Sequence, residues 1–244
     1  MPDVTSSKVE LIDQLWLPKI KEAKSIIYPR KKKGGMRLFT LTDGISFGDI
    51  SKFEEENLIQ KEDVVAWVKT MIKRFRAEAE SVGTVFDGHI YDNELFLGNS
   101  CQAKVLFPFD IINLDFESQE PTLERGRIEI EMDKLEKIII LQNRHSCNKF
   151  VLMYTTLIDT CDIDANRVKQ TSDSLTMSGW NGIEPNGFTG LIIDSIVKQR
   201  FLRNFFEQLI RKYAYTCVPT IACFPCNING LDVQLFSIAG IFMR

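Results

Sequence analysis

The stretch Val105-Leu106-Phe107-Pro108-Phe109-Asp110-Ile111-Ile112-Asn113-Leu114-Asp115-Phe116 decides the fold that we expect. It reads as an apolar strand that carries polar residues, Asn113 and Asp115, at its carboxyl end. In open α/β sheets, ligands bind and chemistry takes place at the carboxyl ends of the strands. The sequence therefore predicts a fold class and the place of a site within it.

Strand patterns and helix patterns alternate along the chain on both sides of this stretch. The expected strands cover residues 36–42, 64–68, 84–86, 105–116 and 149–157, with helical patterns through residue 58 and at 71–81, 132–141 and 191–213. Two apolar runs, 219–228 and 231–243, are joined by Asn229-Gly230, a strong hairpin signal. We therefore predict an α/β fold: a Rossmann-like, mainly parallel sheet with helices on both faces and a C-terminal antiparallel β-hairpin.

The domain organisation that we expect is one α/β domain, residues 36–244, behind an N-terminal arm and linker, residues 1–35. Apolar residues from Val9 to Ile27 approximate helical spacing, although Pro18 interrupts them. The run Arg30-Lys31-Lys32-Lys33 is interpreted as a solvated linker, with contact to phosphates as the alternative. Residues 159–190 are polar and predict a surface insertion that serves as a lid or binds a partner.

Composition excludes several classes of protein. No apolar run approaches the roughly 20 residues that a membrane span needs, and the amino terminus has no secretory signal pattern, so we expect a cytoplasmic protein. Six cysteines in 244 residues are too sparse for a disulfide scaffold. Cys223-Phe224-Pro225-Cys226 has no second cysteine pair and lies in an expected strand, so we predict no metal site. The net charge of -3 argues against a uniformly basic nucleic-acid-binding body but allows a local basic groove.

The strand and helix alternation, the terminal hairpin, the glycine turn after the first strand and the Asn-Leu-Asp-Phe of the fourth together resemble the class I S-adenosylmethionine-dependent methyltransferases. Residues 109–116 resemble the fourth motif of enzymes that methylate amino groups of bases, including the tRNA guanine N2-methyltransferases. The resemblance covers roughly residues 37–243. It implies S-adenosylmethionine as the cofactor.

The resemblance also implies which residues hold that cofactor. The turn with Asp43, Gly44 and Gly48 would lie against its methionine and ribose, although these glycines are more widely spaced than in the family, and an ordinary strand-to-helix turn is the alternative. Asp87 would accept a hydrogen bond from the adenine amino group, unless its Asp-Gly pair only forms a turn. The family has an acid after its second strand, whereas this chain has Lys69, which cannot accept hydrogen bonds. Either the strand boundary is shifted, or the site binds something else, or it is empty.

Asn113, Asp115 and Phe116 are the residues that the resemblance implies for chemistry. Methyl transfer to an exocyclic amine is an in-line displacement, which needs a positioned amine and a proton acceptor. Asn113 could orient the amine, Asp115 could take its proton, and Phe116 could stack on a flipped base. The alternative is that Asp115 caps the following turn and Phe116 belongs to the core.

Two functions from different classes remain open at this point. The first is a methyltransferase that acts on nucleic acid, with the basic run and residues 159–190 helping to hold the substrate. The second is a binding or scaffold subunit that keeps the fold but has lost the cofactor, and that contacts a protein partner through the N-terminal arm or residues 159–190. Lys69 favours the second function, and the segment from Asn113 to Phe116 favours the first.

Overall fold

The computed structural model describes residues 4–27, 35–42, 48–79, 82–88, 102, 106–116, 127–158, 203–228 and 231–244. The predicted residues Asp43 and Gly44, the basic run and residues 159–190 lie outside these ranges.

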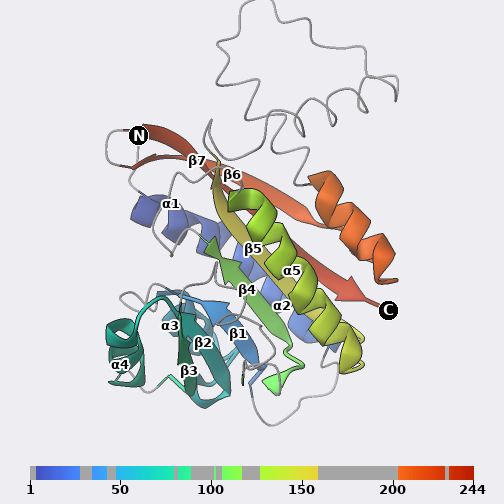
Figure 1. Cartoon of the computed structure of the whole chain (residues 1–244), viewed down its shortest axis with the longest axis horizontal. Helices are drawn as coiled ribbons and strands as arrows, with labels where there is room; N and C mark the ends of the chain where they lie inside the picture. The colour runs from blue at the N-terminus through green and yellow to red at the C-terminus, as the bar shows by residue number, and fades with distance from the viewer. Residues whose placement is uncertain are drawn as a thin grey trace, which may run out of the picture.

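One seven-stranded sheet organises the described part of the chain (Figure 1), in the order β3-β2-β1-β4-β5-β7-β6. The strands are β1 Leu38–Leu41, β2 Val64–Val68, β3 Thr84–Asp87, β4 Ile111–Asp115, β5 Lys149–Ile158, β6 Thr220–Ile228 and β7 Leu231–Met243. The first five strands pair in parallel, whereas β7 runs antiparallel to both β5 and β6. The predicted α/β fold with a mainly parallel sheet and a terminal hairpin is confirmed.

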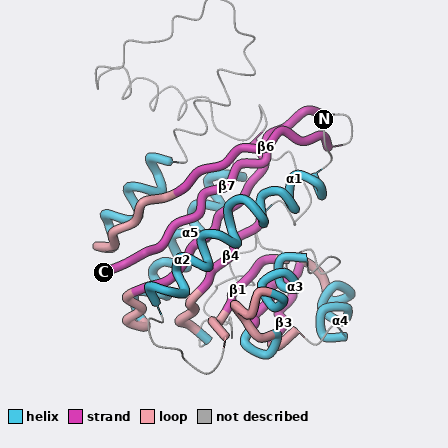
Figure 2. The backbone as a smooth tube through the Cα atoms, turned by 180° about the vertical axis from the view of Figure 1, so that it is seen from behind, coloured by secondary structure: helices cyan, strands magenta, loops and turns pink. Residues whose placement is uncertain are grey.

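Helices cover both faces of the sheet. They are α1 Val4–Leu11, η1 Ile12–Trp16, α2 Leu17–Ile27, α3 Gly48–Glu55, the short 3₁₀ turn η2 Lys61–Asp63, α4 Met71–Ala79, α5 Arg127–Arg144 and a helix at residues 203–212. Figure 1 shows α5 in front of the sheet, and Figure 2, from behind, shows α1 and α2 on the opposite face. None of the described helices is both long enough and apolar enough to cross a membrane.

Side chains alternate between the two faces because successive residues of a strand point in opposite directions. In β1, Leu38 belongs to the core under α1, η1, α2 and α3, and Phe39 to the core under α5. In β4, Ile111 faces the first of these cores, and Ile112 and Leu114 face the second. The same alternation places Asn113 and Asp115 on the face that the N-terminal helices cover.

The N-terminal arm is built into the core on this face. Helical structure runs from residue 4 to 27 despite Pro18, and η1 is a π-helical segment in which Leu17 N–H donates to the Ile12 carbonyl. Trp16, Ile20 and Ala23 are fully buried against the sheet. The arm therefore shares its core with the residues of α3 and of the strands.

The strand predicted at residues 105–116 is shorter than expected. β4 begins only at Ile111, because the backbone N–H and carbonyl of Phe109 bond to the side chain of Gln142, at 2.8 and 2.7 Å, rather than to a strand. Phe107 and Phe109 instead pack their rings on Phe39, with centroids 5.8 and 5.5 Å away. The apolar character of this stretch thus reflects core packing as well as strand structure.

The terminal hairpin follows the prediction closely. Ile228 pairs with Leu231, so two residues connect β6 to β7. The Asn-Gly dipeptide that indicated the hairpin occupies these two positions. β7 then pairs with β5 along ten residues, from Ile158↔Gln234 to Lys149↔Met243, and thereby joins the hairpin to the parallel part of the sheet.

Candidate functional site

The candidate site lies where β1 and β4 are neighbours. The chain places β2 and β3 on one side of β1, and β4 and β5 on the other, so the strand order reverses between β1 and β4. In open α/β sheets this reversal leaves a crevice at the carboxyl ends of the two strands, where ligands bind. Thr40 pairs with Asn113 in the register of these strands, which brings their side chains together on one face.

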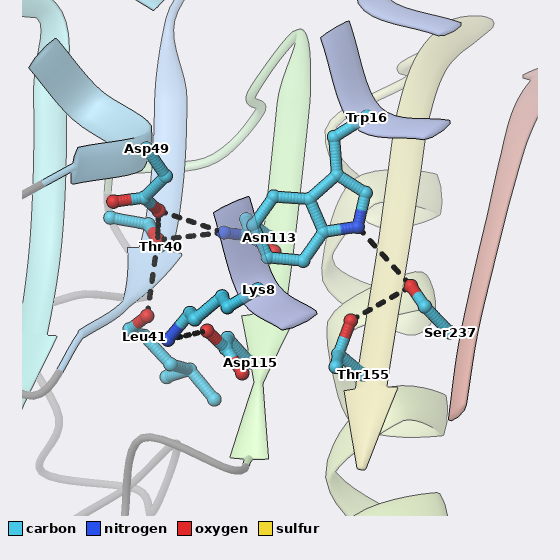
Figure 3. Close-up of polar contacts among 9 residues, drawn as sticks. All are labelled: Lys8, Trp16, Thr40, Leu41, Asp49, Asn113, Asp115, Thr155 and Ser237. Carbon is cyan, nitrogen blue, oxygen red and sulfur yellow. Dashed lines mark hydrogen bonds and ion pairs between the residues drawn. The ribbon is translucent and has the colours of Figure 1, made fainter. Parts of the chain in front are cut away.

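Asn113, Asp49 and Thr40 form a hydrogen-bonded cluster at this position (Figure 3). Asn113 Nδ2 donates to Asp49 Oδ2 at 3.0 Å and to Thr40 Oγ1 at 3.3 Å. Asp49 lies in the first turn of α3, where the helix dipole favours an acidic side chain. All three residues are buried. The cluster thus links β1, β4 and α3.

The side-chain carbonyl of Asn113 has no hydrogen-bond partner among the described residues. The Asn113 amide is oriented with its Nδ2 group toward Asp49 Oδ2, to which it donates, and this leaves the carbonyl oxygen without a donor among the described residues. An unsatisfied buried acceptor costs about 1–3 kcal/mol. Such a group in a native protein calls for an explanation, and a bound ligand or water is one.

Asp115, two residues further along β4, forms an ion pair with the N-terminal arm. Lys8 Nζ lies 2.5 Å from Asp115 Oδ2, and the two side chains are 20% and 2% exposed. Figure 3 shows Lys8 reaching from its helix toward the carboxylate. The carboxyl end of β4 is therefore in contact with α1.

The electrostatics of the cluster are dominated by burial. Removal from water raises the pKa of the Asp49 carboxyl; the Lys8 ammonium opposes this shift, and the Asp115 carboxylate adds to it. Hydrogen bonds from the Ile50 backbone N–H and the Asn113 amide favour the charged form. The net direction is upward, so Asp49 holds a proton more readily than an exposed aspartate does.

A second group of buried polar residues continues the cluster across the sheet. Asp115, Thr155 and Ser237 lie side by side in the register of β4, β5 and β7. Thr155 Oγ1 and Ser237 Oγ are 2.8 Å apart, and Trp16 Nε1 donates to Ser237 Oγ at 3.2 Å. Ser237 Oγ also lies within 3.2 Å of the Tyr154 carbonyl, to which it donates. The arm is thus attached to the sheet at polar groups as well as apolar ones.

The structure assigns Phe116 to packing. Its side chain is 2% exposed, and its ring centroid lies 5.7 Å from that of Tyr154 in the core under α5. A ring enclosed in this way has no free face for a base. The core position, which was the alternative at the sequence level, is the one observed.

Asp87 lies at the end of β3, which is the edge strand of the sheet. Its Oδ1 accepts from Arg74 Nη1 of α4 at 3.0 Å, and its side chain is 24% exposed. The next residue, Gly88, has φ 148°, a conformation that favours glycine, and accepts a hydrogen bond from Trp67 Nε1. The Asp-Gly pair therefore ends the strand in a turn, and the carboxylate already pairs with an arginine.

Two further predicted positions can be placed. β2 ends at Val68, so Lys69 does follow it directly and a shifted boundary does not explain the missing acid. Gly48 is the first residue of α3, and a β-carbon there would meet no described atom within 4 Å. Gly48 is exposed at the start of α3 and directly precedes Asp49 of the polar cluster.

Sequence reasoning missed five residues of this site: Lys8, Thr40, Asp49, Thr155 and Ser237. Thr40 shares the register and face of Asn113, and Asp49 lies in the first helical turn after the glycine segment, so both carried a signal. Lys8 carried none. Among the described residues, no group of three or more His, Cys, Asp or Glu side chains could hold a metal ion, and Cys147, Cys217 and Cys223 are free thiols.

Comparison with known proteins gives structural neighbours only. The sequence matches no protein-family model and no curated protein. The methyltransferase domain of bacterial CtHen1 is 7% identical with a TM-score of 0.45, covering 96% of this chain and 100% of that chain. M. jannaschii TYW2 in complex with AdoMet is 10% identical with a TM-score of 0.44, covering 93% and 76%. The small RNA methyltransferase HEN1 is 12% identical with a TM-score of 0.43, covering 94% and 26%.

These identities and scores add no detail to the site. What assigns the architecture is the strand order β3-β2-β1-β4-β5-β7-β6 with a reversed β7, together with helices on both faces. The chain has a Rossmann-like α/β fold with a mainly parallel seven-stranded sheet.

Proposed function

We propose that this protein binds S-adenosylmethionine at the β1 and β4 carboxyl ends and transfers its methyl group to an amino group. The observation that carries the proposal is the buried, unpartnered carbonyl of Asn113, which lies in a polar cluster at the reversal of strand order. A carbonyl that lacks a donor in this position suits a ligand that brings one.

The residues present fit this cofactor in part. The open space at Gly48 would admit a ligand against the start of α3, and Asn113 would accept a hydrogen bond from it. Lys69 does not fit, because an ammonium cannot accept the hydrogen bonds of ribose hydroxyls. Ribose recognition would therefore use other groups than the carboxylate typical of the fold.

When bound, S-adenosylmethionine supplies an activated methyl group. The chain's own residues would then have two tasks, positioning the acceptor amine and taking its proton. Asp115, at the end of β4, would accept a hydrogen bond or the proton from the amine once Lys8 is displaced. Asn113 lies two residues before it on the same face and would orient the ligand.

For the acceptor, we propose the amino group of a nucleic-acid base. The basic run at residues 30–33 supports this substrate class, since lysines and arginines bind phosphates. Phe116 is not a stacking platform, so a flipped base would need another aromatic or planar side chain. The test is transfer of labelled methyl from S-adenosylmethionine to unmodified RNA or DNA. Asp115→Asn should abolish transfer, and Thr156→Val, on the opposite face of β5, should not.

A second candidate function is a methyltransferase-like binding subunit without catalysis. Two features favour it. Lys69 stands where the fold would place an acid that binds the ribose, and the Lys8–Asp115 ion pair engages the carboxylate expected to accept the proton. Such a subunit would bind a protein partner through the arm or residues 159–190.

Calorimetric titration with S-adenosylmethionine and S-adenosylhomocysteine separates the two functions. Binding in the micromolar range corresponds to about 8 kcal/mol and supports the cofactor site. Gly48→Leu should weaken binding at least tenfold without lowering the melting temperature, because its side chain would fill the open space, and Gly48→Ala is the matched small control. No heat with either ligand, for the wild type and for Lys8→Met alike, would refute cofactor binding.

A further inference from the structure

The Lys8 ammonium forms an ion pair with Asp115, the carboxylate that must be accessible for the proposed function. Lys8 Nζ lies 2.5 Å from Asp115 Oδ2, and Asp115 is 2% exposed. Asp49, the other acid of the cluster, also feels the Lys8 charge. In the described structure a cation from the protein itself thus sits at the acidic end of the site (Figure 3).

Lys8 is better suited to block this site than to react in it. A lysine attacks a methyl group only through the lone pair of its neutral amine. In the ion pair with Asp115 the Lys8 side chain is an ammonium, which has no lone pair. The geometry therefore describes a stable ion pair and not a poised nucleophile.

The helix that carries Lys8 packs on the sheet through one side only. In α1, Ser7 and Leu11 are buried, whereas Ser6 and Glu10 are exposed and Val9 is 55% exposed. The following segments bury Trp16 and Ile20 completely, and the Trp16 indole bonds to Ser237. Because Lys8 lies on α1, a ligand that takes its place at Asp115 must move α1, whereas Trp16 and Ile20 can keep η1 and α2 on the sheet.

The junction between these parts is the π-helical segment η1, Ile12–Trp16. π-helical turns are rare and are often found at functional sites. It lies directly after Leu11 and separates α1 from α2.

We infer that α1 is an autoinhibitory segment whose Lys8 ammonium fills the place of a ligand cation at Asp115. A ligand with a cationic centre, of the class to which S-adenosylmethionine belongs, displaces Lys8 and lifts α1. This inference rests on the proposed function, because it assumes that the cluster binds such a ligand.

The test is calorimetric titration of S-adenosylmethionine into the wild type and three variants of the full chain. Lys8→Met keeps the length of the side chain but removes its charge, and should bind at least tenfold more tightly. Lys8→Arg keeps the charge and should bind like the wild type. Lys21→Met removes a charge from the exposed Lys21–Glu56 pair on α2 and is the matched control for net charge.

Hydrogen exchange on the wild type gives a second readout that does not depend on the folding of Lys8→Met. Ligand binding should speed exchange of the amides in residues 5–11 and leave those of residues 17–27 unchanged. Equal affinities of Lys8→Met and Lys8→Arg, or slower exchange of α1 with ligand, would overturn autoinhibition. A gain of one methyl group on Lys8 during incubation would also overturn it, because Lys8 would then be an acceptor. Absence of binding in every variant would instead refute the proposed function itself.

Discussion

The indole N–H of Trp16 donates to the hydroxyl of Ser237 across 3.2 Å, and both groups are fully buried although 221 residues separate them in the sequence. This bond fastens the N-terminal arm to β7. Ser237 also lies within hydrogen-bond distance of Thr155 Oγ1 and the Tyr154 carbonyl, so its one donor and two acceptor positions are all used.

The coupling between Trp16 and Ser237 can be measured with a double-mutant cycle of Trp16→Phe and Ser237→Ala. We expect each single change to lower the free energy of unfolding by about 1–3 kcal/mol, because each leaves a buried polar group without its partner. The pair should couple by about 1 kcal/mol, a size typical of contacting residues, in urea denaturation. Additive effects would show that the bond does not fasten the arm.

Adjacent threonines of β5 provide a matched comparison. Thr155 bonds to Ser237, whereas the hydroxyl of Thr156, on the opposite face, has no partner among the described residues. Both side chains are fully buried. Thr155→Val should cost about 1–2 kcal/mol, and Thr156→Val should be neutral or stabilising, because valine removes a hydroxyl that bonds to nothing. Equal losses in thermal or urea unfolding would contradict this account.

The Lys8–Asp115 pair should respond unequally to removal of its two members. Lys8→Met leaves a carboxylate that is 2% exposed without that ammonium, whereas Asp115→Asn leaves an ammonium that is 20% exposed and can turn to water. We expect losses of about 3 kcal/mol for Lys8→Met and about 1 kcal/mol for Asp115→Asn, since removing the counter-ion of the more deeply buried charge is the costlier change. The comparison needs unfolding curves at low and high salt. The reverse order of stabilities would show that Asp115 is not buried as described.

Asp49 makes stability depend on pH. Burial raises the pKa of its carboxyl, so the folded state binds the proton more tightly than the unfolded state. Its stabilising contribution is therefore full below the unfolded pKa, and it is lost as the pH rises through the raised folded pKa. Asp49→Asn should exceed the wild type in unfolding free energy by about 1 kcal/mol at pH 7, and this advantage should shrink toward pH 4.

A control for this pH dependence is Asp133→Asn, because the Asp133 side chain is 50% exposed on α5. It should shift the free energy of unfolding by less than about 0.5 kcal/mol at either pH. An advantage of Asp49→Asn that stays constant from pH 7 to pH 4 would argue against a raised pKa.

The fold could be predicted from the sequence because its signals are local. Alternating strand and helix patterns and the Asn-Gly between two apolar runs need only neighbouring residues. The start of β4 could not be predicted, since it depends on the Gln142 side chain, which bonds to the backbone of Phe109 from 33 positions away along the chain. Hydrophobic periodicity indicates that residues are buried, but it does not distinguish a strand from a packed loop.

The part of the site that could be predicted is the part on β4. Asn113 and Asp115 are on the expected strand and at its carboxyl end. Lys8 and Ser237 reach the site through the docking of the arm and through the hairpin, and nothing near them in the sequence records these contacts. The role expected for Phe116 gave way to core packing, because alternation turns it to the face opposite Asp115.

Calorimetric titration of S-adenosylmethionine into the wild type and Lys8→Met, side by side, tests the proposed cofactor site and its inhibition by Lys8 together. We predict heat from both proteins, with binding to Lys8→Met at least tenfold tighter. Failure of both proteins to bind S-adenosylmethionine or S-adenosylhomocysteine would contradict the proposed function, and would leave a Rossmann-like fold that serves another purpose.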